Sequence, residues 1–212
     1  MIVFFKKVGL ESVGFDGYYY TTISDVQASF GFGDGIRIGY TVDCSVMPLF
    51  SNSISTNNLQ SGVNSQAYCI TFINCTASNN AVNGFNFVSA NQVNLTNVVA
   101  NNNGYNVPSY INAGGLNLYL ANYLSNATIT NSVFSNNIVY GIYIYAGTWY
   151  TNYVLQGNTI SQNVQGGAYF ENSDVTASYL IENNTFSYNY NTALTIYRLE
   201  NGTYNSEVIS NQ

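Results

Sequence analysis

Short segments of alternating apolar and polar residues recur along the chain from residue 74 onward. Each repeat contains an asparagine, four other residues and a second asparagine, and later a small residue followed by alternating apolar positions. The asparagine pairs are Asn74 and Asn79, Asn97 and Asn102, Asn131 and Asn136, Asn158 and Asn163, and Asn184 and Asn189. A period of two predicts β-strands, so we expect an all-β chain.

The repeat length indicates a solenoid. The first asparagines of successive pairs are 23, 34, 27 and 26 residues apart. The small residue before each alternating segment is Gly84, Gly115, Gly141, Gly167 or Ala193. Strands repeated at this period bury their apolar side only by stacking on their neighbours. We therefore predict a parallel β-helix of about six rungs.

A third apolar segment precedes each asparagine pair. The residue four positions before the first asparagine is apolar in every repeat: Ile70, Val93, Ala127, Val154 and Leu180. Three segments per rung favour a roughly triangular coil with three sheets around one core. Gln156 and Glu182 interrupt the inward pattern of their strands. Either those strands slip by one residue, or the core accommodates a polar group.

The asparagine columns are interpreted as structural. An amide side chain both donates and accepts hydrogen bonds, so identical amides one strand apart can bond along the stack as a ladder. Asparagine also tolerates the left-handed backbone of a tight corner.

The repeat divides the chain into two regions. Residues 1–22 are expected to form an N-terminal cap or leading strand, and residues 23–212 the β-helix, with a loop or imperfect rung at 41–66 and an insertion near 103–114. Val208, Ile209 and Asn211 resemble the start of another rung. We expect further rungs or a capping chain at the C-terminal end, because an uncovered solenoid end exposes strand edges.

Charge is scarce. The chain has four basic and ten acidic residues, a net charge of −6, and no charged residue from Cys44 through Phe170. Four basic residues are too few to follow a phosphate backbone, so nucleic acid is not an expected partner. No run of 18 or more apolar residues occurs, which argues against membrane insertion.

The cysteines suggest no metal site. Cys69 and Cys75 are six residues apart, which fits no common zinc spacing, and Cys44 makes the count odd. A disulfide between two of the three stays open, although we favour the interpretation that all three are small buried apolar residues. We expect no metal and no cofactor.

Phrases such as "NTISQNVQGGAYF", "NSVFSNNIVYGIYI" and "ENNTFSYNYNTALTIY" resemble the repeats of the right-handed parallel β-helix proteins, the pectin-lyase-like superfamily. That superfamily includes polysaccharide lyases, glycoside hydrolases, phage tailspikes and adhesins. The resemblance implies that an enzyme would place acidic residues on the outer face of its central rungs. The central rungs here have none, so an enzyme is not favoured.

Tyrosines form the most suggestive outward columns. Alternation places Val88, Tyr119, Tyr145, Glu171 and Tyr197 in one column and Asn86, Asn117, Tyr143, Tyr169 and Thr195 in the next. Flat aromatic and amide side chains could contact sugars without charge. Tyrosine also favours strands, so simple stacking of the rings explains the columns equally well.

Two functions follow as hypotheses. The first is a non-catalytic extracellular, cell-surface or virion-surface β-helix, a rigid structural or adhesive module that binds glycans or a surface partner through Tyr119, Tyr143, Tyr145, Tyr169, Glu171 and Tyr197. The alternative is a polysaccharide-degrading enzyme using Glu171 and nearby carboxylates such as Asp174, Glu182 and Glu200. Because few charges repel one another at low pH, an acidic exterior, such as that around an acidophile, is a further expectation.

Overall fold

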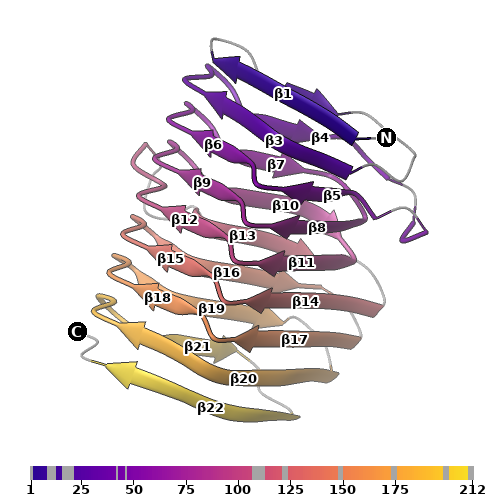
Figure 1. Ribbon diagram of the computed structural model, residues 1–212. Helices are drawn as coiled ribbons and strands as arrows, with labels where there is room; N and C mark the ends of the chain where they lie inside the picture. The colour runs from indigo at the N-terminus through magenta and orange to yellow at the C-terminus, as the bar shows by residue number, and fades with distance from the viewer. Residues whose placement is uncertain are drawn as a thin grey trace.

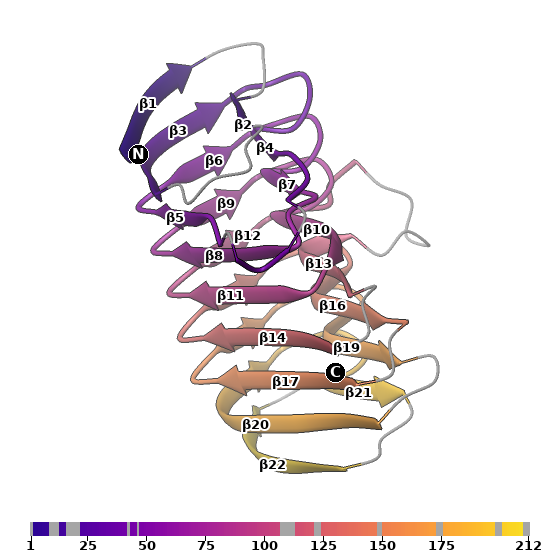
Figure 2. The same ribbon diagram turned by 90° about the vertical axis from the view of Figure 1, so that its right-hand side faces the viewer.

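The computed structural model describes residues 2–8, 13–15, 22–41, 43–45, 47–106, 113–120, 124–147, 150–172, 176–197 and 201–209. These residues form a right-handed parallel β-solenoid of about six turns, which confirms the predicted fold (Figure 1). Among them there is no helix. The chain coils from the N-terminal strands at one end of the stack to the C-terminal strands at the other (Figure 2).

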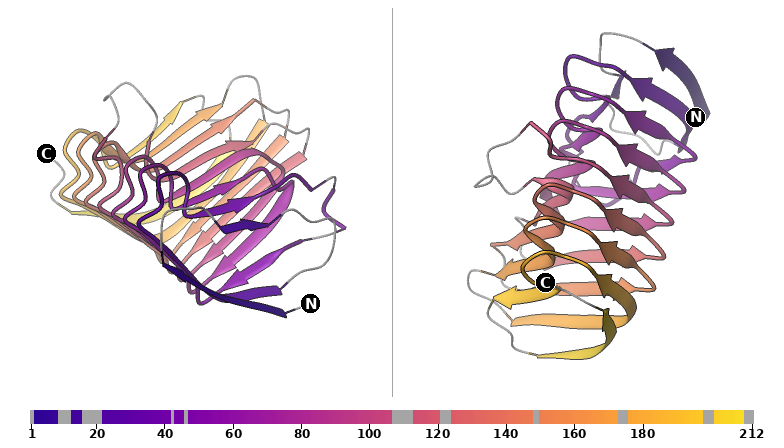
Figure 3. Two further views of the ribbon diagram at one scale, coloured as in Figure 1. Left: turned by 90° about the horizontal axis from the view of Figure 1, so that it is seen from above. Right: turned by 90° about the vertical axis from the view of Figure 1, so that its left-hand side faces the viewer.

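Each turn contributes strands to three faces, which are seen from above in Figure 3. The first face contains β1 (Ile2–Val8), β3 (Thr22–Ser29), β5 (Leu49–Ser51), β8 (Cys69–Ile73), β11 (Gln92–Thr96), β14 (Leu124–Thr130), β17 (Tyr150–Gln156), β20 (Thr176–Ser187) and β22 (Asn201–Ile209). The second contains β6 (Ile54–Thr56), β9 (Thr76–Ser78), β12 (Val99–Asn101), β15 (Val133–Ser135) and β18 (Thr159–Ser161). The third contains β2 (Val13–Phe15), β4 (Ile36–Ile38), β7 (Val63–Ser65), β10 (Phe85–Ala90), β13 (Gly114–Leu120), β16 (Tyr140–Ala146), β19 (Gly166–Asn172) and β21 (Leu194–Tyr197).

The first two faces belong to one 14-stranded sheet, sheet A, because the long strands β3 and β20 each pair with strands of both faces. The third face is a separate eight-stranded sheet, sheet B. The segment 41–66, expected as a loop or imperfect rung, contains β5, β6 and β7, one strand for each face. Residues 107–112 of the expected insertion lie outside the described residues.

Inward side chains of the three faces fill one continuous core. Phenylalanine rings run along its axis: Phe50 stacks on Phe72 with centroids 4.9 Å apart, and Phe72 meets Phe85 edge to face at 5.5 Å. Burial of this apolar core is the main favourable contribution to the stability of the coil.

In the last turns the strands that contain Gln156 and Glu182 are shifted by one residue from the predicted register, which was the first of the two explanations for these polar residues. Ala127 pairs with Tyr153, and Tyr153 with Tyr179, so tyrosines occupy the inward column. Tyr153 and Tyr179 are 1% and 3% exposed, and their rings stack with centroids 4.9 Å apart. The expectation that Val154 and Leu180 point inward is therefore wrong. Gly157, with φ of 67°, occupies the left-handed corner that Asn131 holds in the preceding turn, so the predicted alignment of Asn158 with Asn131 is wrong by one residue.

A buried asparagine ladder runs through the second corner of the coil, between the second face and sheet B. Its members are Asn58, Asn80, Asn103, Asn137, Asn163 and Asn189, each 0% exposed. The Nδ2 of each donates to the Oδ1 of the next at 2.9 to 3.1 Å. The predicted ladder is thus confirmed.

Its membership needs correction, because the predicted columns combine two neighbouring positions. Asn79, Asn102 and Asn136 precede ladder residues and take the left-handed corner conformation, with φ of 56° each. At the first corner of the coil, between the first and second faces, Asn158 and Asn184 likewise do not align with Asn131. They lie one position after the residues that align with Asn131, are buried, and form their own amide pair at 2.9 Å.

Cys44 and Cys69 form a disulfide with their Cα atoms 5.1 Å apart. The bond ties the segment that follows β4 to the start of β8. The favoured interpretation of three unpaired cysteines is therefore wrong, because two positions 25 residues apart become neighbours when one turn stacks on the next. Cys75 is the free, buried thiol.

Candidate functional site

The predicted site residues lie on the outer face of sheet B, where the strand register aligns them in two columns. Asn117, Tyr143, Tyr169 and Thr195 form one column, and Tyr119, Tyr145, Glu171 and Tyr197 the other. The alternating residues of the same strands, such as Leu118 and Ile144, are buried in the core. We call the tyrosines of these columns, with Glu171, the tyrosine face.

The tyrosine rings stack in pairs along the coil axis. Tyr119 and Tyr145 are 5.0 Å apart with their planes 4° from parallel, and Tyr143 and Tyr169 are 5.7 Å apart at 7°. Stacked rings turn their edges and phenol groups outward and cover the ring faces between them. The surface therefore offers hydroxyl groups and aromatic edges more than open ring faces.

Tyr143 is less accessible than the sequence suggested. Only 6% of it is exposed, whereas Tyr119 is 40% and Tyr197 is 55% exposed. Its hydroxyl donates to Oε2 of Glu171 at 2.6 Å, diagonally across to the next strand. Burial and this hydrogen bond to a carboxylate raise the pKa of Tyr143, so the phenol stays protonated at neutral pH.

Tyr140 is a member of this cluster that the sequence interpretation did not include. Its ring is 5.8 Å from that of Tyr143 and 5.4 Å from that of Tyr169. It pairs with Gly114 on one side and Gly166 on the other, and a Cβ at Gly166 would lie 3.2 Å from the Tyr140 ring. The Gly-Gly pairs at 114–115 and 166–167 lie on the strands on either side of Tyr140, and they are the sequence signal that a large ring occupies the strand between these two.

An amide column extends the outer face toward the N-terminal end. Asn117 donates to Asn86 at 2.8 Å, Asn86 to Asn64 at 3.1 Å, and Asn64 to the carboxylate of Asp34 at 2.8 Å. Val88 was expected to head the Tyr119 column, but it has no partner there. The pairing of β10 with β13 is irregular between Phe87 and Ala90, and Ser89 adopts a φ of 63°.

Charged groups are few on this face. Among its described residues only Asp34, Arg37 and Glu171 are charged. Asp174, Arg198 and Glu200 lie outside the described residues, and Glu182 belongs to β20 in sheet A. In the part of the chain that the structure describes, no three His, Cys, Asp or Glu side chains gather as a metal site would require, and no helix is long and apolar enough to cross a membrane.

Comparison with known proteins agrees with this architecture. Residues 11–178 match the family model described as the right handed beta helix region, and the chain belongs to that family. No curated protein sequence matches it significantly.

Two solved structures are similar in fold. Pectate lyase Pel9A is 18% identical with a TM-score of 0.47, over 80% of this chain and 50% of the lyase, so the chain spans about half of its length. The A-module of mannuronan C-5 epimerase AlgE6 from Azotobacter vinelandii is 15% identical with a TM-score of 0.41, over 96% of this chain and 80% of the module.

Proposed function

We propose that this chain is a non-catalytic, surface-exposed β-helix that binds glycans through the tyrosine face. The observation that carries the proposal is the stacked pair Tyr119 and Tyr145, which lies beside an amide column on the same sheet. Successive strands repeat every 4.7 to 4.9 Å, so hydroxyl and amide groups recur regularly along this face. A polysaccharide presents hydroxyl groups that could pair with such an array.

The ligand is expected to be uncharged. Charged polysaccharides need several opposite charges in the protein, whereas the described residues of the whole outer side of sheet B include one arginine, Arg37, and two carboxylates, Asp34 and Glu171. The phenols of Tyr140, Tyr143 and Tyr169 all have a raised pKa, chiefly because burial disfavours the phenolate. They therefore remain neutral hydrogen-bond donors and acceptors over the physiological range.

The scarcity of carboxylates supports a binding role over catalysis. Glycoside hydrolysis uses a pair of carboxyl groups about 5 to 10 Å apart. On the described part of the tyrosine face Glu171 is the one carboxylate, and it accepts the hydrogen bond of Tyr143. That short bond is also the observation that favours the alternative, a polysaccharide-degrading enzyme in which Glu171 and Tyr143 exchange a proton with the sugar.

The disulfide supports the location that we propose, an extracellular, cell or virion surface. Disulfides form and persist mainly in oxidising environments. The Cys44–Cys69 bond closes one turn of the coil and therefore suits a rigid module outside the cell.

The test is binding to an array of neutral and acidic polysaccharides. The double variant Tyr119→Ser with Tyr145→Ser should lose retention, and the control Tyr150→Ser, an exposed tyrosine of sheet A, should keep it. Equal retention of both variants on the polysaccharide that wild type binds would overturn the proposal. Release of cleaved sugar that Glu171→Gln abolishes would establish the enzyme instead.

A further inference from the structure

The sequence contains five Asn-X-Thr motifs, the acceptor pattern for N-linked glycosylation when X is not proline. In four of them the structure describes the asparagine side chain: Asn74, Asn94, Asn126 and Asn183. Such motifs arise by chance in a chain this rich in asparagine and threonine, so the motif alone selects none of them. What distinguishes the four is the surroundings of the side-chain amide, because the sugar is attached to its Nδ2 atom.

Asn74 and Asn94 have amide groups that already donate hydrogen bonds along the coil. Nδ2 of Asn74 lies 3.3 Å from Oδ1 of Asn52, and Nδ2 of Asn94 lies 3.5 Å from Oγ1 of Thr71. Oδ1 of Asn74 also accepts from Asn97 at 3.2 Å. A sugar on either Nδ2 would disturb a column of bonded side chains, so both positions are poor acceptors in the folded chain.

Asn126 lies within the flat part of sheet A. It belongs to β14, between Gln92 of β11 and Asn152 of β17, and it is half-buried. Its Oδ1 accepts from Nδ2 of Asn152 at 3.0 Å. The first sugar of a glycan at this position would lie against the side chains of both neighbouring strands, which leaves it little room.

Asn183 differs from the other three because it projects from the first corner beside a position that has no side chain. It is exposed, with φ of 55°. The equivalent corner residue of the preceding turn is Gly157, whose N–H donates to the carbonyl of Glu182 at 3.1 Å. Gly157 therefore separates Asn183 from Asn131, the corner asparagine of the turn before. Among the described residues, none forms a hydrogen bond with the Asn183 side chain.

The other two residues of this motif hold the acceptor in place. Asn184 is buried, and its Nδ2 donates to the carbonyl of Leu155 at 2.8 Å. Thr185 then begins the part of β20 that pairs with Thr159 of β18, and it is partly exposed. Alternation about the buried Asn184 places Asn183 and Thr185 on the same, outer side of the coil. The exposed amide and the threonine of the motif are thus available together.

We propose that Asn183 carries an N-linked glycan. In this reaction a bond forms between Nδ2 of Asn183 and the anomeric carbon of a sugar in a lipid-linked pyrophosphate oligosaccharide. The bond from that carbon to the pyrophosphate breaks, the lipid pyrophosphate leaves, and one proton of Nδ2 is released to water. The Cys44–Cys69 disulfide supports the proposal, because disulfides and N-linked glycans both belong to chains that leave the cytosol.

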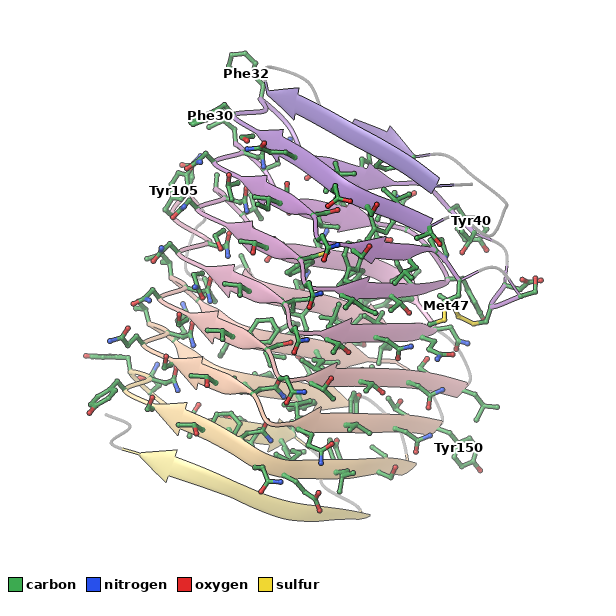
Figure 4. All side chains as sticks on the ribbon, viewed as in Figure 1. Phe30, Phe32, Tyr40, Met47, Tyr105 and Tyr150 are labelled. Carbon is green, nitrogen blue, oxygen red and sulfur yellow. A yellow bond between two sulfur atoms is a disulfide. The ribbon has the colours of Figure 1, made fainter. Side chains whose placement is uncertain are left out.

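The first corner is a suitable edge for a bulky polar group. In Figure 1 the two faces of sheet A that meet at this corner lie in front of sheet B, so a glycan on Asn183 projects away from the tyrosine face. Figure 4, seen from the same side, labels exposed rings that project from the left and right edges instead: Phe30, Phe32, Tyr40, Tyr105 and Tyr150. Only 7% of the residues are charged, and a glycan supplies hydration without charge.

The intact mass of the chain secreted by a eukaryotic cell line tests the modification. Asn183→Gln should lose the mass of one oligosaccharide relative to wild type. This variant is expected to fold, because Gln162 already occupies a left-handed corner with φ of 57°. The matched control Asn74→Gln, at the same corner, should lose none. Release of the glycan from wild type by a peptide N-glycosidase in heavy-oxygen water should introduce the isotope at Asn183.

Variants of the third motif position separate glycosylation from a structural effect of the corner. Thr185→Ala should abolish the modification of Asn183, whereas Thr185→Ser, which keeps the motif, should retain it. Thr159→Ala, which changes the paired threonine of β18, should leave it unchanged. An unmodified Asn183 in secreted wild type, or modification that Thr185→Ala leaves intact, would overturn the proposal. Polysaccharide retention by Asn183→Gln should equal that of wild type, so the glycan that the chain carries and the glycan that it binds are tested separately.

Discussion

Asn137 donates two hydrogen bonds to a single atom of Asn163: its backbone N–H and its Nδ2 both lie 3.0 Å from the Oδ1 of Asn163. Its own Oδ1 in turn accepts from the backbone and side chain of Asn103, at 3.0 and 3.1 Å. The Nδ2 also reaches the carbonyl of Ala100 at 3.0 Å. The amide of Asn137 therefore satisfies two buried backbone groups of the preceding turn, the N–H of Asn103 and the carbonyl of Ala100, and also bonds to the side chain of Asn163 in the next turn.

Replacing Asn137 should consequently destabilise the coil strongly. Asn137→Ala leaves the donors of Asn103 and the carbonyl of Ala100 unsatisfied in the interior, at about 1 to 3 kcal/mol each. We expect a loss of about 3 kcal/mol in the free energy of unfolding, measured by urea denaturation. The neighbouring Asn136→Gly is the control: Asn136 is exposed with φ of 56°, a conformation that glycine adopts readily. Equal losses for the two variants would contradict the ladder's role.

The glycine column beside the ladder should tolerate no side chain. A Cβ at Gly141 would lie 2.7 Å from Nδ2 of Asn163 and 2.8 Å from the carbonyl oxygen of Gly167. Gly141→Ala must displace buried backbone, so we expect a loss of about 1 to 3 kcal/mol in thermal or urea unfolding. Gly14→Ala has nothing within 4 Å of its new methyl group and should unfold as wild type does. A neutral Gly141→Ala would show that the turns can separate locally.

The repeat made the fold predictable, because period-two segments that share a register can bury their apolar side only by stacking. The register within a turn was harder to predict. In Asn79–Asn80, Asn102–Asn103 and Asn136–Asn137 the exposed corner residue and the buried ladder residue are both asparagine. The sequence of those turns therefore does not show which of the two asparagines is the ladder residue. The two positions differ in residue type only where Gln162 and Tyr188 occupy the corner.

The sequence predicted which residues belong to the tyrosine face better than it predicted how exposed each of them is. Alternation correctly placed Tyr119, Tyr145 and Tyr169 outward, because each lies between inward residues of one strand. The burial of Tyr143 depends on Tyr140, which precedes the alternating segment, and on the diagonal bond to Glu171. Neither relation follows from spacing along a single strand.

Reduction of the disulfide should lower stability measurably. Cys44 and Cys69 are separated by 25 residues, for which loop-closure entropy predicts about 3.5 kcal/mol of stabilisation. Dithiothreitol should lower the melting temperature of wild type and leave that of Cys44→Ser unchanged. Equal melting of the reduced and oxidised protein would contradict a stabilising bond.

The free thiol of Cys75 should resist alkylation in the folded protein, because burial raises its pKa to about 11.

Acid should have little effect on the fold. The buried polar network consists of amides and hydroxyls, such as the ladder from Asn58 to Asn189, and these do not titrate. We expect circular dichroism to show a folded chain at a pH of about 3, where most carboxylates are protonated. Cooperative unfolding between neutral pH and that value would contradict this expectation and, with it, the acidic exterior expected from the sequence.

Alkali should unfold the protein. Burial raises the pKa of Tyr153, with a further contribution from Tyr179, and it raises the pKa of Tyr143. A group whose pKa is higher in the folded state stabilises that state fully below its unfolded pKa, about 10 for tyrosine, and loses this contribution as pH rises toward the folded value. Stability should therefore stay constant up to about pH 10 and fall above it. Tyr153→Phe, which cannot ionise, should postpone alkaline unfolding relative to the exposed control Tyr150→Phe, as followed by phenolate absorbance and circular dichroism together. Ionisation of every tyrosine near pH 10 without loss of structure would mean that the Tyr153 ring is accessible to solvent in the folded chain.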